Sequence, residues 1–217
     1  MVNASIKKKT NAMVKIYHSP GTRGFRVIWA CEELAVPYLI EPVDFSLEFR
    51  MRDDFLALSP AGKVPAMTDG DTVMAESGAM LQYLINKYDT VNLQPKINHP
   101  AYAQYLQWSW FAEATFTIPI SEMIKHRRTF PNNVNEHVVK EFINRAQFCA
   151  DVLDRELTDQ WIIGEQFTGA DIMLGMTLSG YKKHVSNDLP KRVEAYYERL
   201  TQRPGFIRSA EVEAQSA

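Results

Sequence analysis

The chain has 217 residues, 46% of them hydrophobic and 23% charged, and a net charge of −2. This is the composition of a globular chain with one large or two small domains, and its slight acidity argues against a general nucleic-acid binder, which would carry a basic face or tail. Cys31 and Cys149 lie far apart and form no CxxC pair, which argues against a disulfide scaffold and favours a reduced, cytoplasmic protein.

Targeting and membrane signals are missing from the sequence pattern. We find no apolar run of the ~20 residues needed to cross a bilayer, so no membrane association is expected. The first twelve residues, MVNASIKKKTNA, are polar and lack the apolar core of a secretory signal. We expect residues 1–12 to be a disordered leader and the ordered chain to begin near Met13.

The first structural unit predicted is a strand, a helix and a second strand. Val14–Tyr17 is the first strand, and we expect Tyr17 to point into the sheet as a packing residue. A helix follows over Thr22–Ala35, where apolar residues recur at i, i+4 and i+7, and Tyr38–Val43 is the second strand. A connection of this length favours a parallel pair with a right-handed crossover.

A weaker helix, a hairpin and a longer helix follow. Glu48–Leu58 has a weak helical pattern that ends at Ser59-Pro60. Asp69-Gly70 is a tight-turn signal between short strands at Ala66–Thr68 and Thr72–Ala75. A helix is predicted over Ser77–Tyr88, with Ser77 as its cap. The order βαβ, α, ββα predicts an α/β thioredoxin-like N-terminal domain at residues 13–88.

The pattern changes after a polar linker at residues 89–98, and no strand signal follows it. We therefore predict an all-α helical-bundle domain at residues 99–217. Its first helix covers His99–Met123, and Pro119 is expected to kink or end it. A second helix covers roughly Asn135–Leu157.

The rest of this domain contains a helix-start signal. Thr168 and Asp171, three residues apart, form a capping box before a helix that is apolar almost all round and is therefore expected to be buried. A last helix is predicted over about Pro190–Gln202, and the polar tail beyond Arg208 is expected to fray.

The stretch SPAGKVPAMTDGDTVMAESGAML combines features suited to a small peptide-like ligand. Backbone N–H groups near Ser77, at a helix start, attract a carboxylate, and Glu76 is placed to take an ammonium. Val64, before Pro65, offers main-chain hydrogen bonds to an extended peptide, and Lys63 offers a charge to a second carboxylate. A plain β-hairpin leading into a capped helix explains the same residues equally well.

At this point the chain resembles the glutathione S-transferase family from about Met13 to Phe206. The resemblance rests on KIYHSPGTRGFRVIWACEEL, SPAGKVPAM, AESGAML and FTGADIML in the family's order, and WFAEATFTIPI looks like its bacterial and fungal branch. It implies a homodimer, a cis bond at Pro65 and glutathione as co-substrate, without a metal. The γ-glutamyl end would then meet Glu76 and Ser77.

The resemblance also implies how the rest of the tripeptide would lie. Its cysteinyl backbone would pair with Val64, and its glycine carboxylate would fall near Lys63. The alternative for Lys63 is an ordinary solvent-exposed lysine without a ligand. The thiol would be activated by a hydroxyl in HSPGTRG. One alignment of the family places Ser19 there and another places Thr22; we favour Thr22, at the helix start, although serine is commoner there.

Other residues have more than one interpretation. Arg23 either adds positive potential at the site or is a surface arginine. Cys31 lies on an apolar helix face and is interpreted as core. Tyr105, Trp108 and Phe111 are candidates for the wall that binds a small hydrophobic electrophile, with core or dimer contact as the alternative for each. Tyr102 and Phe116 share that interpretation, and Phe49 is a candidate dimer contact.

The implied activity is a glutathione S-transferase. The same thiolate would also serve a glutathione-dependent peroxidase or isomerase, and a non-catalytic binding or scaffold protein with this fold is the alternative of a different class. A glutaredoxin-like disulfide reductase is disfavoured, because the loop after the first strand holds no cysteine.

Overall fold

The computed structural model describes residues 13–215. The expected leader therefore lies outside the described residues. A four-stranded sheet in the order β2-β1-β3-β4 forms the first layer. Its strands are β1 (Val14–His18), β2 (Tyr38–Pro42), β3 (Ala66–Asp69) and β4 (Thr72–Ala75).

The pairing of these strands matches the sequence pattern. β1 and β2 are parallel, whereas β3 is antiparallel to both β1 and β4. Gly70, at φ +62°, makes the turn between β3 and β4 with the left-handed backbone that a tight hairpin needs. The predicted βαβ unit and hairpin are confirmed, and together they give the thioredoxin-like domain.

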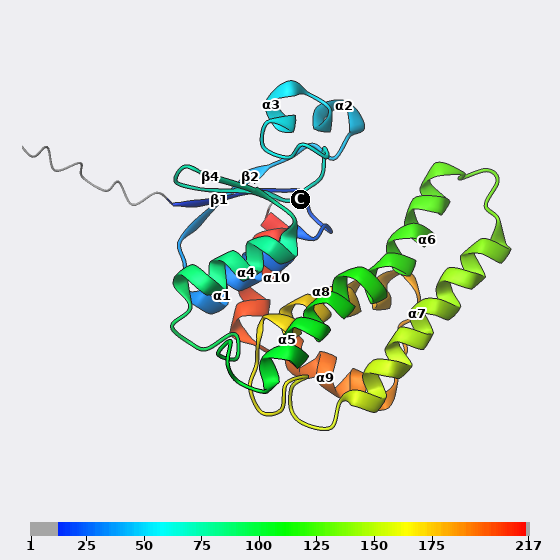
Figure 1. The fold of residues 1–217 in the computed structure, drawn as a ribbon. Helices are drawn as coiled ribbons and strands as arrows, with labels where there is room; N and C mark the ends of the chain where they lie inside the picture. The colour runs from blue at the N-terminus through cyan, green and yellow to red at the C-terminus, as the bar shows by residue number, and fades with distance from the viewer. Residues whose placement is uncertain (1–12, 216–217) are drawn as a thin grey trace, which may run out of the picture.

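Two helices cover one face of this sheet (Figure 1): α1 (Gly24–Leu34) and α4 (Ser77–Tyr88). α1 is buried on nearly every side, because α4, α8 and α10 all pack against it. On the other side, the weak helix predicted over Glu48–Leu58 is two short helices, α2 (Leu47–Arg50) and α3 (Asp53–Leu56). The buried side chains of β1 alternate as Val14, Ile16 and His18, so Tyr17 lies half-buried on the opposite face.

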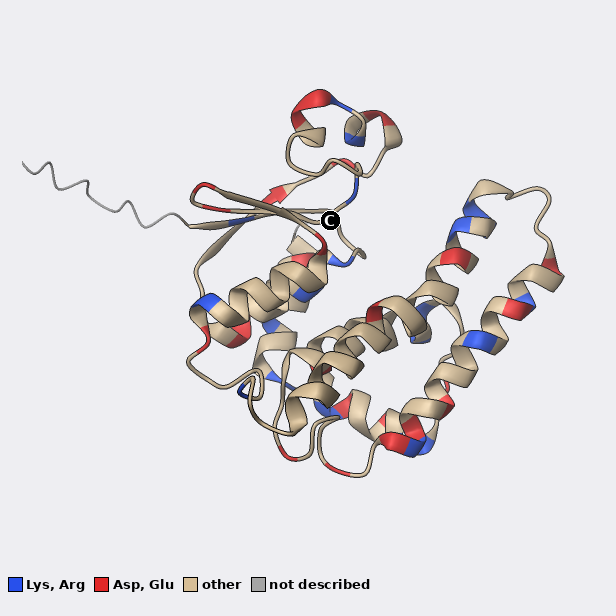
Figure 2. Ribbon diagram, viewed as in Figure 1, with Lys and Arg blue, Asp and Glu red and all other residues tan. Residues whose placement is uncertain are grey.

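The second domain is helical. Residues 89–100 contain no helix or strand, and then α5 (Ala101–Trp110), a π-helical segment η1 (Phe111–Phe116) and α6 (Thr117–Thr129) run on without interruption. α7 (Glu136–Glu156), α8 (Gly169–His184) and α9 (Lys191–Thr201) complete the bundle. Figure 2 shows acidic and basic residues interspersed along α6 and α7.

Pro119 does not end its helix, which continues to Thr129. The irregularity instead precedes the proline, in η1, where the N–H of Thr117 bonds to the carbonyl of Ala112, five residues back. A π turn is compatible with a nearby proline, because proline has no N–H for the i→i−4 hydrogen bonds of a regular α-helix.

The start of α8 follows the sequence prediction. The Asp171 carboxylate accepts from the backbone N–H (2.7 Å) and the hydroxyl (2.9 Å) of Thr168, and from the hydroxyl of Tyr196 (2.7 Å). The helix is buried over most of its surface, as predicted. Burial raises the pKa of Asp171, and the hydrogen bonds partly offset that effect.

The C-terminal segment differs from the prediction. The chain beyond Arg208 is part of a regular helix, α10 (Pro204–Gln215), instead of a frayed tail. α10 packs along α1 (Figure 1), and its Ser209 is fully buried. The expectation was wrong because this helix is stabilised by contacts with a segment far away in the sequence, which its own polar composition does not reveal.

Candidate functional site

The register of the strands brings three predicted segments to the same end of the sheet. Tyr17 of β1 pairs with Ala66 of β3, and Ala66 pairs with Ala75 of β4. The residues that follow β1, precede β3 and follow β4 therefore meet at the same end of the sheet. These segments carry, in turn, Ser19–Thr22, Lys63–Pro65 and Glu76–Ser77.

The segment before β3 presents an open peptide edge. The Val64-Pro65 bond is cis, as predicted. Within residues 13–215 neither the N–H nor the C=O of Val64 has a hydrogen-bond partner. The turn before it is fixed by the buried Ser59, whose hydroxyl accepts from the N–H of Lys63 at 3.1 Å. An unpaired backbone edge beside a rigid turn is suited to an added peptide strand.

The side chain of Lys63 is exposed next to that edge. Gly62 precedes it at φ +59°, and a Cβ there would lie 2.9 Å from the carbonyl oxygen of Arg50. Arg50 in turn donates to the carbonyl of Gly62 at 2.8 Å. The turn is thus held from both sides, and two basic side chains border it.

The segment after β4 is strained at its predicted binding residue. Glu76 is exposed and has φ +71°, a conformation that L-residues rarely adopt and that costs on the order of 1–3 kcal/mol. Backbone strain of this kind accumulates at ligand sites. Ser77, by contrast, does not cap α4 as expected: it lies inside the first turn, and Glu76 precedes the helix without a side-chain cap bond.

The hydroxyl of Ser77 is instead engaged by an arginine that the sequence reasoning missed. Arg26, on α1, is fully buried, and its Nη1 donates to Ser77 Oγ at 3.2 Å and to the carboxylate of Glu113. Nη2 donates to Thr117 (3.3 Å) and Thr177 (3.2 Å). Burial lowers the pKa of Arg26, and the charge of Glu113 opposes this. The network joins the predicted binding residue to the helical domain.

A signal for this network was present in the sequence. Arg26 stands in the otherwise apolar run GFRVIWAC, and Glu113 is the sole acid in the aromatic run WSWFAEATF. A charge within an apolar helix face needs a partner in the folded protein. The sequence indicates that such partners exist, but not which residues they are.

The loop after β1 carries both candidate hydroxyls. Thr22 Oγ1 donates to the carbonyl oxygen of Ser19 at 2.6 Å, so the two residues hold the loop together. Ser19 is 8% exposed, and its own hydroxyl has no hydrogen-bond partner in the described part of the chain. α1 begins two residues after Thr22 without a side-chain cap, and the N–H of Phe25 donates to the carbonyl of Thr22 at 3.2 Å, so the start of the helix is joined to this loop.

Arg23 and Cys31 have different surroundings. Arg23 contacts Glu113 (3.4 Å) and donates to Ser121 (3.1 Å), so its charge is shared with the helical domain. Cys31 is fully buried, and burial raises the pKa of its thiol, which confirms it as a core residue. A buried thiol with a raised pKa is inert as a nucleophile.

The three candidate wall aromatics are not equivalent. Tyr105 is 1% exposed and donates its hydroxyl to Gln82 at 2.8 Å, and Trp108 is 6% exposed. Both side chains belong to the hydrophobic core, which is one of the roles that the sequence left open. Phe111 is half-buried, and its ring packs edge-on against that of Trp108 at 5.0 Å. Of the three aromatics it keeps the most exposed surface for contact with a ligand.

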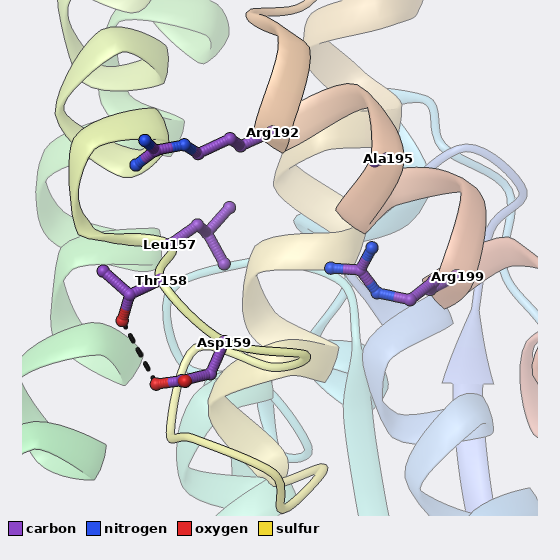
Figure 3. Close-up of a pocket in the computed structure, with 6 residues that line it drawn as sticks. All are labelled: Leu157, Thr158, Asp159, Arg192, Ala195 and Arg199. Carbon is purple, nitrogen blue, oxygen red and sulfur yellow. Dashed lines mark hydrogen bonds between the residues drawn. The ribbon is translucent and has the colours of Figure 1, made fainter.

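A surface pocket of about 420 Å³ lies elsewhere, between the end of α7 and α9 (Figure 3). Its arginines already have protein partners: Arg199 donates to the carbonyl of Gln160 (2.9 Å), and Arg192 to that of Asp154 (3.4 Å). Nothing at this pocket corresponds to the predicted site residues. It is lined by Leu157, Thr158, Asp159, Arg192, Ala195 and Arg199.

Residues 13–215 contain no group of three or more His, Cys, Asp or Glu side chains placed to hold a metal ion. No helix in this range is both long and apolar enough to cross a membrane.

Comparison with known proteins gives consistent matches. Residues 16–95 match the family model described as glutathione S-transferase, N-terminal domain. Glutathione S-transferase 3 of Schizosaccharomyces pombe is 26% identical over 212 residues, covering 92% of this chain and 87% of that protein. The disulfide-bond oxidoreductase YfcG of Escherichia coli is 24% identical over 203 residues, covering 88% and 92%. A solved glutathione transferase family member from Pseudomonas fluorescens pf-5, with two glutathione bound, has a TM-score of 0.79 at 26% identity and covers 94% of each chain.

Proposed function

We infer that this chain belongs to the glutathione S-transferase family, and on that basis we propose that it binds glutathione at this end of the sheet and transfers its sulfur to a small hydrophobic electrophile. The observation that carries this proposal is the strand register, which brings Val64, Glu76–Ser77 and the Ser19–Thr22 loop to one end of the sheet. Binding of a thiol-containing tripeptide needs three elements: backbone groups that pair with its main chain, partners for its charged γ-glutamyl group, and a hydrogen-bond donor to its sulfur.

The grip on glutathione follows from charge and backbone geometry. The exposed carboxylate of Glu76 would take the γ-glutamyl ammonium, and Ser77 with the first N–H groups of α4 would take its carboxylate. The open N–H and C=O of Val64 would pair with the cysteinyl residue. Lys63 is placed for the glycine carboxylate.

Sulfur chemistry requires the thiolate. A free thiol has a pKa of about 8.5, and lowering it by about two units takes ~2.7 kcal/mol of preferential stabilisation of the thiolate. A hydroxyl that donates to the sulfur contributes about 1.5–3 kcal/mol, because the acceptor is charged. We assign this donor to Thr22, whose bond to the carbonyl of Ser19 would be exchanged for the stronger bond to the thiolate.

The thiolate would attack an electrophilic atom, form a carbon–sulfur bond and expel the leaving group with its electron pair. For an unsaturated carbonyl, addition of a proton takes the place of that departure. Phe111 is the aromatic we place in the wall for the electrophile. A cytoplasmic homodimer is the form we propose for the working protein.

Titration calorimetry with two ligands tests whether Glu76 and Ser77 bind the γ-glutamyl group. Glutathione should bind, and cysteinylglycine, which lacks the γ-glutamyl group, should bind far more weakly. Ser77→Ala should weaken glutathione binding by roughly 10- to 100-fold, the loss of a hydrogen bond to a charged group. The same change should leave cysteinylglycine binding unaltered. No heat with glutathione would argue for a protein that keeps the fold as a scaffold.

Turnover with glutathione and chlorinated aromatics, hydroperoxides or unsaturated carbonyls tests the chemistry. Thr22→Ala should lower kcat by roughly 10- to 100-fold while glutathione binding is retained. If Ser19→Ala has that effect and Thr22→Ala does not, the donor is the serine. Activity with hydroperoxides alone would identify a peroxidase.

A second candidate function is disulfide reduction with glutathione. It is favoured by the similarity to the oxidoreductase YfcG and by the two glutathione molecules in the Pseudomonas fluorescens relative. Two glutathione thiols would reduce one disulfide and leave as glutathione disulfide, so no protein cysteine is needed. A coupled assay with a small disulfide as the oxidant distinguishes the two candidates, because conjugation releases no glutathione disulfide.

A further inference from the structure

α10 is anchored along the whole length of α1. At its N-terminal end Arg203 forms a two-bond pair with Glu33 (2.8 and 2.7 Å). The ring of Phe206 packs edge-on against Phe25 (5.2 Å) and Trp29 (5.0 Å). Figure 1 shows this helix beneath the sheet, with its C-terminal end toward the sheet. The helix is therefore a fixed part of the thioredoxin-like domain, although it comes last in the sequence.

The last turn of α10 reaches the loop that carries the candidate hydroxyls. Glu213 Oε1 accepts from the backbone N–H of Gly21 at 2.9 Å and lies 3.3 Å from Nε2 of His18. Gly21 is exposed and has φ +75°, so without this bond little else would fix its backbone. A single carboxylate oxygen from residue 213 thus holds the middle of the segment between Ser19 and Thr22.

His18 fixes the other side of the same segment. Its imidazole is fully buried, and a Cβ on Gly24 would lie 2.2 Å from its Nδ1, so the ring is wedged against the start of α1. Neither ring nitrogen makes a well-directed hydrogen bond within the described residues; Nε2 only lies near the Glu213 carboxylate, at 3.3 Å. The carbonyl of His18 accepts from Val43 at 2.8 Å.

The charged state of Glu213 fits this arrangement. Its side chain is 24% exposed. Burial acts to raise the pKa of Glu213, but the contact with His18 and the N–H of Gly21 outweigh it and leave the pKa below its usual value. The positive charge of Lys183 acts in the same direction. The group is therefore a carboxylate at neutral pH, the stronger form of hydrogen-bond acceptor.

We propose that Glu213 is a positioning residue for thiol activation. It holds the Ser19–Thr22 loop in the position from which the Thr22 hydroxyl can donate to the sulfur of glutathione. The proposal rests on the proposed function, because it assigns a task to the same loop. In this proposal the end of α10 contributes to thiol activation through the loop, and Glu213 does not contact the ligand. Donors must be held close to their working geometry for their effect on a thiolate to be realised.

Three variants separate this role from general packing. Glu213→Ala removes the acceptor and the charge, whereas Glu213→Gln keeps an oxygen for the N–H of Gly21 and loses only the charge. Glu211→Gln, an exposed carboxylate on the same helix, is the matched control. The full chain is used throughout, with thermal unfolding measured for each variant.

The expected result is a split between binding and chemistry. Glu213→Ala should lower kcat about tenfold through misplacement of the donor, while calorimetry shows an unchanged Kd for glutathione. The pH profile of the bound thiolate, followed by its ultraviolet absorbance, should move up toward the free thiol. Glu213→Gln should fall between the wild type and Glu213→Ala, and Glu211→Gln should match the wild type. Amide hydrogen exchange around Gly21 should be faster in Glu213→Ala even without glutathione.

Two outcomes would overturn the proposal. One is a Glu213→Ala protein whose bound thiolate titrates as in the wild type. The other is a loss of kcat that is matched by equal loss of glutathione affinity and of thermal stability, which would indicate helix packing only. Failure of the proposed function is recognised separately, because the unmutated protein would then give no heat with glutathione.

Discussion

The buried Arg26–Glu113 pair offers a sharp test of how the two domains are joined. Arg26→Met replaces the guanidinium by an apolar chain of similar length. It removes every donor to Ser77 and Glu113 from α1. Thr117 and Thr177 keep a hydrogen bond to each other at 2.8 Å, so they lose less than Glu113 does.

The magnitude follows from what each change leaves behind. Removal of one partner from a buried ion pair costs roughly 3–5 kcal/mol of unfolding free energy. In Arg26→Met the remaining Glu113 is 23% exposed and keeps Arg23 at 3.4 Å, so we expect about 3 kcal/mol, the lower end of that range. In Glu113→Gln the fully buried Arg26 keeps its charge among neutral oxygens, and within residues 13–215 its Nε already has no acceptor. We expect about 5 kcal/mol there.

Urea unfolding of Arg26→Met, Glu113→Gln and the double variant at neutral pH measures these losses. The double variant should lose clearly less than the two single losses combined, because it leaves no unpaired charge buried. Arg52→Met is the control: its ion pair with Asp54 lies on the surface, and the unfolding midpoint should not change. A double variant with additive losses, or Glu113→Gln with a wild-type midpoint, would refute the view that this charge pair is buried and coupled.

Two further predictions concern packing and pH. Gly175→Ala should lower the free energy of unfolding by about 1–3 kcal/mol, because the new Cβ would lie 2.7 Å from Cζ3 of Trp29. Gly180→Ala, on the same helix with its nearest atom at 3.9 Å, should raise it by up to about 1 kcal/mol; equal thermal shifts in the two variants would contradict this reasoning. Burial acts to raise the pKa of Asp69, but bonds from Lys87 and two tyrosine hydroxyls outweigh it and lower the pKa. A lowered native pKa gives stability that is complete above the unfolded value of about 3.9 and is lost as the pH falls through the native value. The stability difference between wild type and Asp69→Asn, measured by urea unfolding across pH, should therefore shrink on acidification, and a difference independent of pH would exclude this role.

The elements that the sequence predicted well are those with a local signal that the structure retains. The hairpin has the turn Asp69-Gly70 between its strands, and α8 has the capping box of Thr168 and Asp171 at its start. The chain after Arg208 has no such signal. Its helix depends on contacts such as Phe206 with Trp29, which the sequence does not bring together.

The candidate site divides in the same way. The segments around Val64 and Ser77 can be predicted as a candidate site because they lie in one continuous stretch with recognisable turn residues. The contacts of Arg26 and Glu213 with these segments cannot, because their partners lie many positions away, at Glu113 and Gly21. A charged residue within an apolar helix pattern signals that a partner exists, but only the fold identifies it.

The π turn at Phe111–Phe116 has a consequence for the history of this chain. A π turn holds one more residue than the regular helix it interrupts, so it can arise or vanish by a single insertion or deletion. Loss of one residue here would rotate Glu113 relative to Thr117 and move it away from Arg26. Among relatives, chains that lack this residue should therefore also have lost the arginine of the first helix, and an alignment rich in such chains would reveal the two changes arising together.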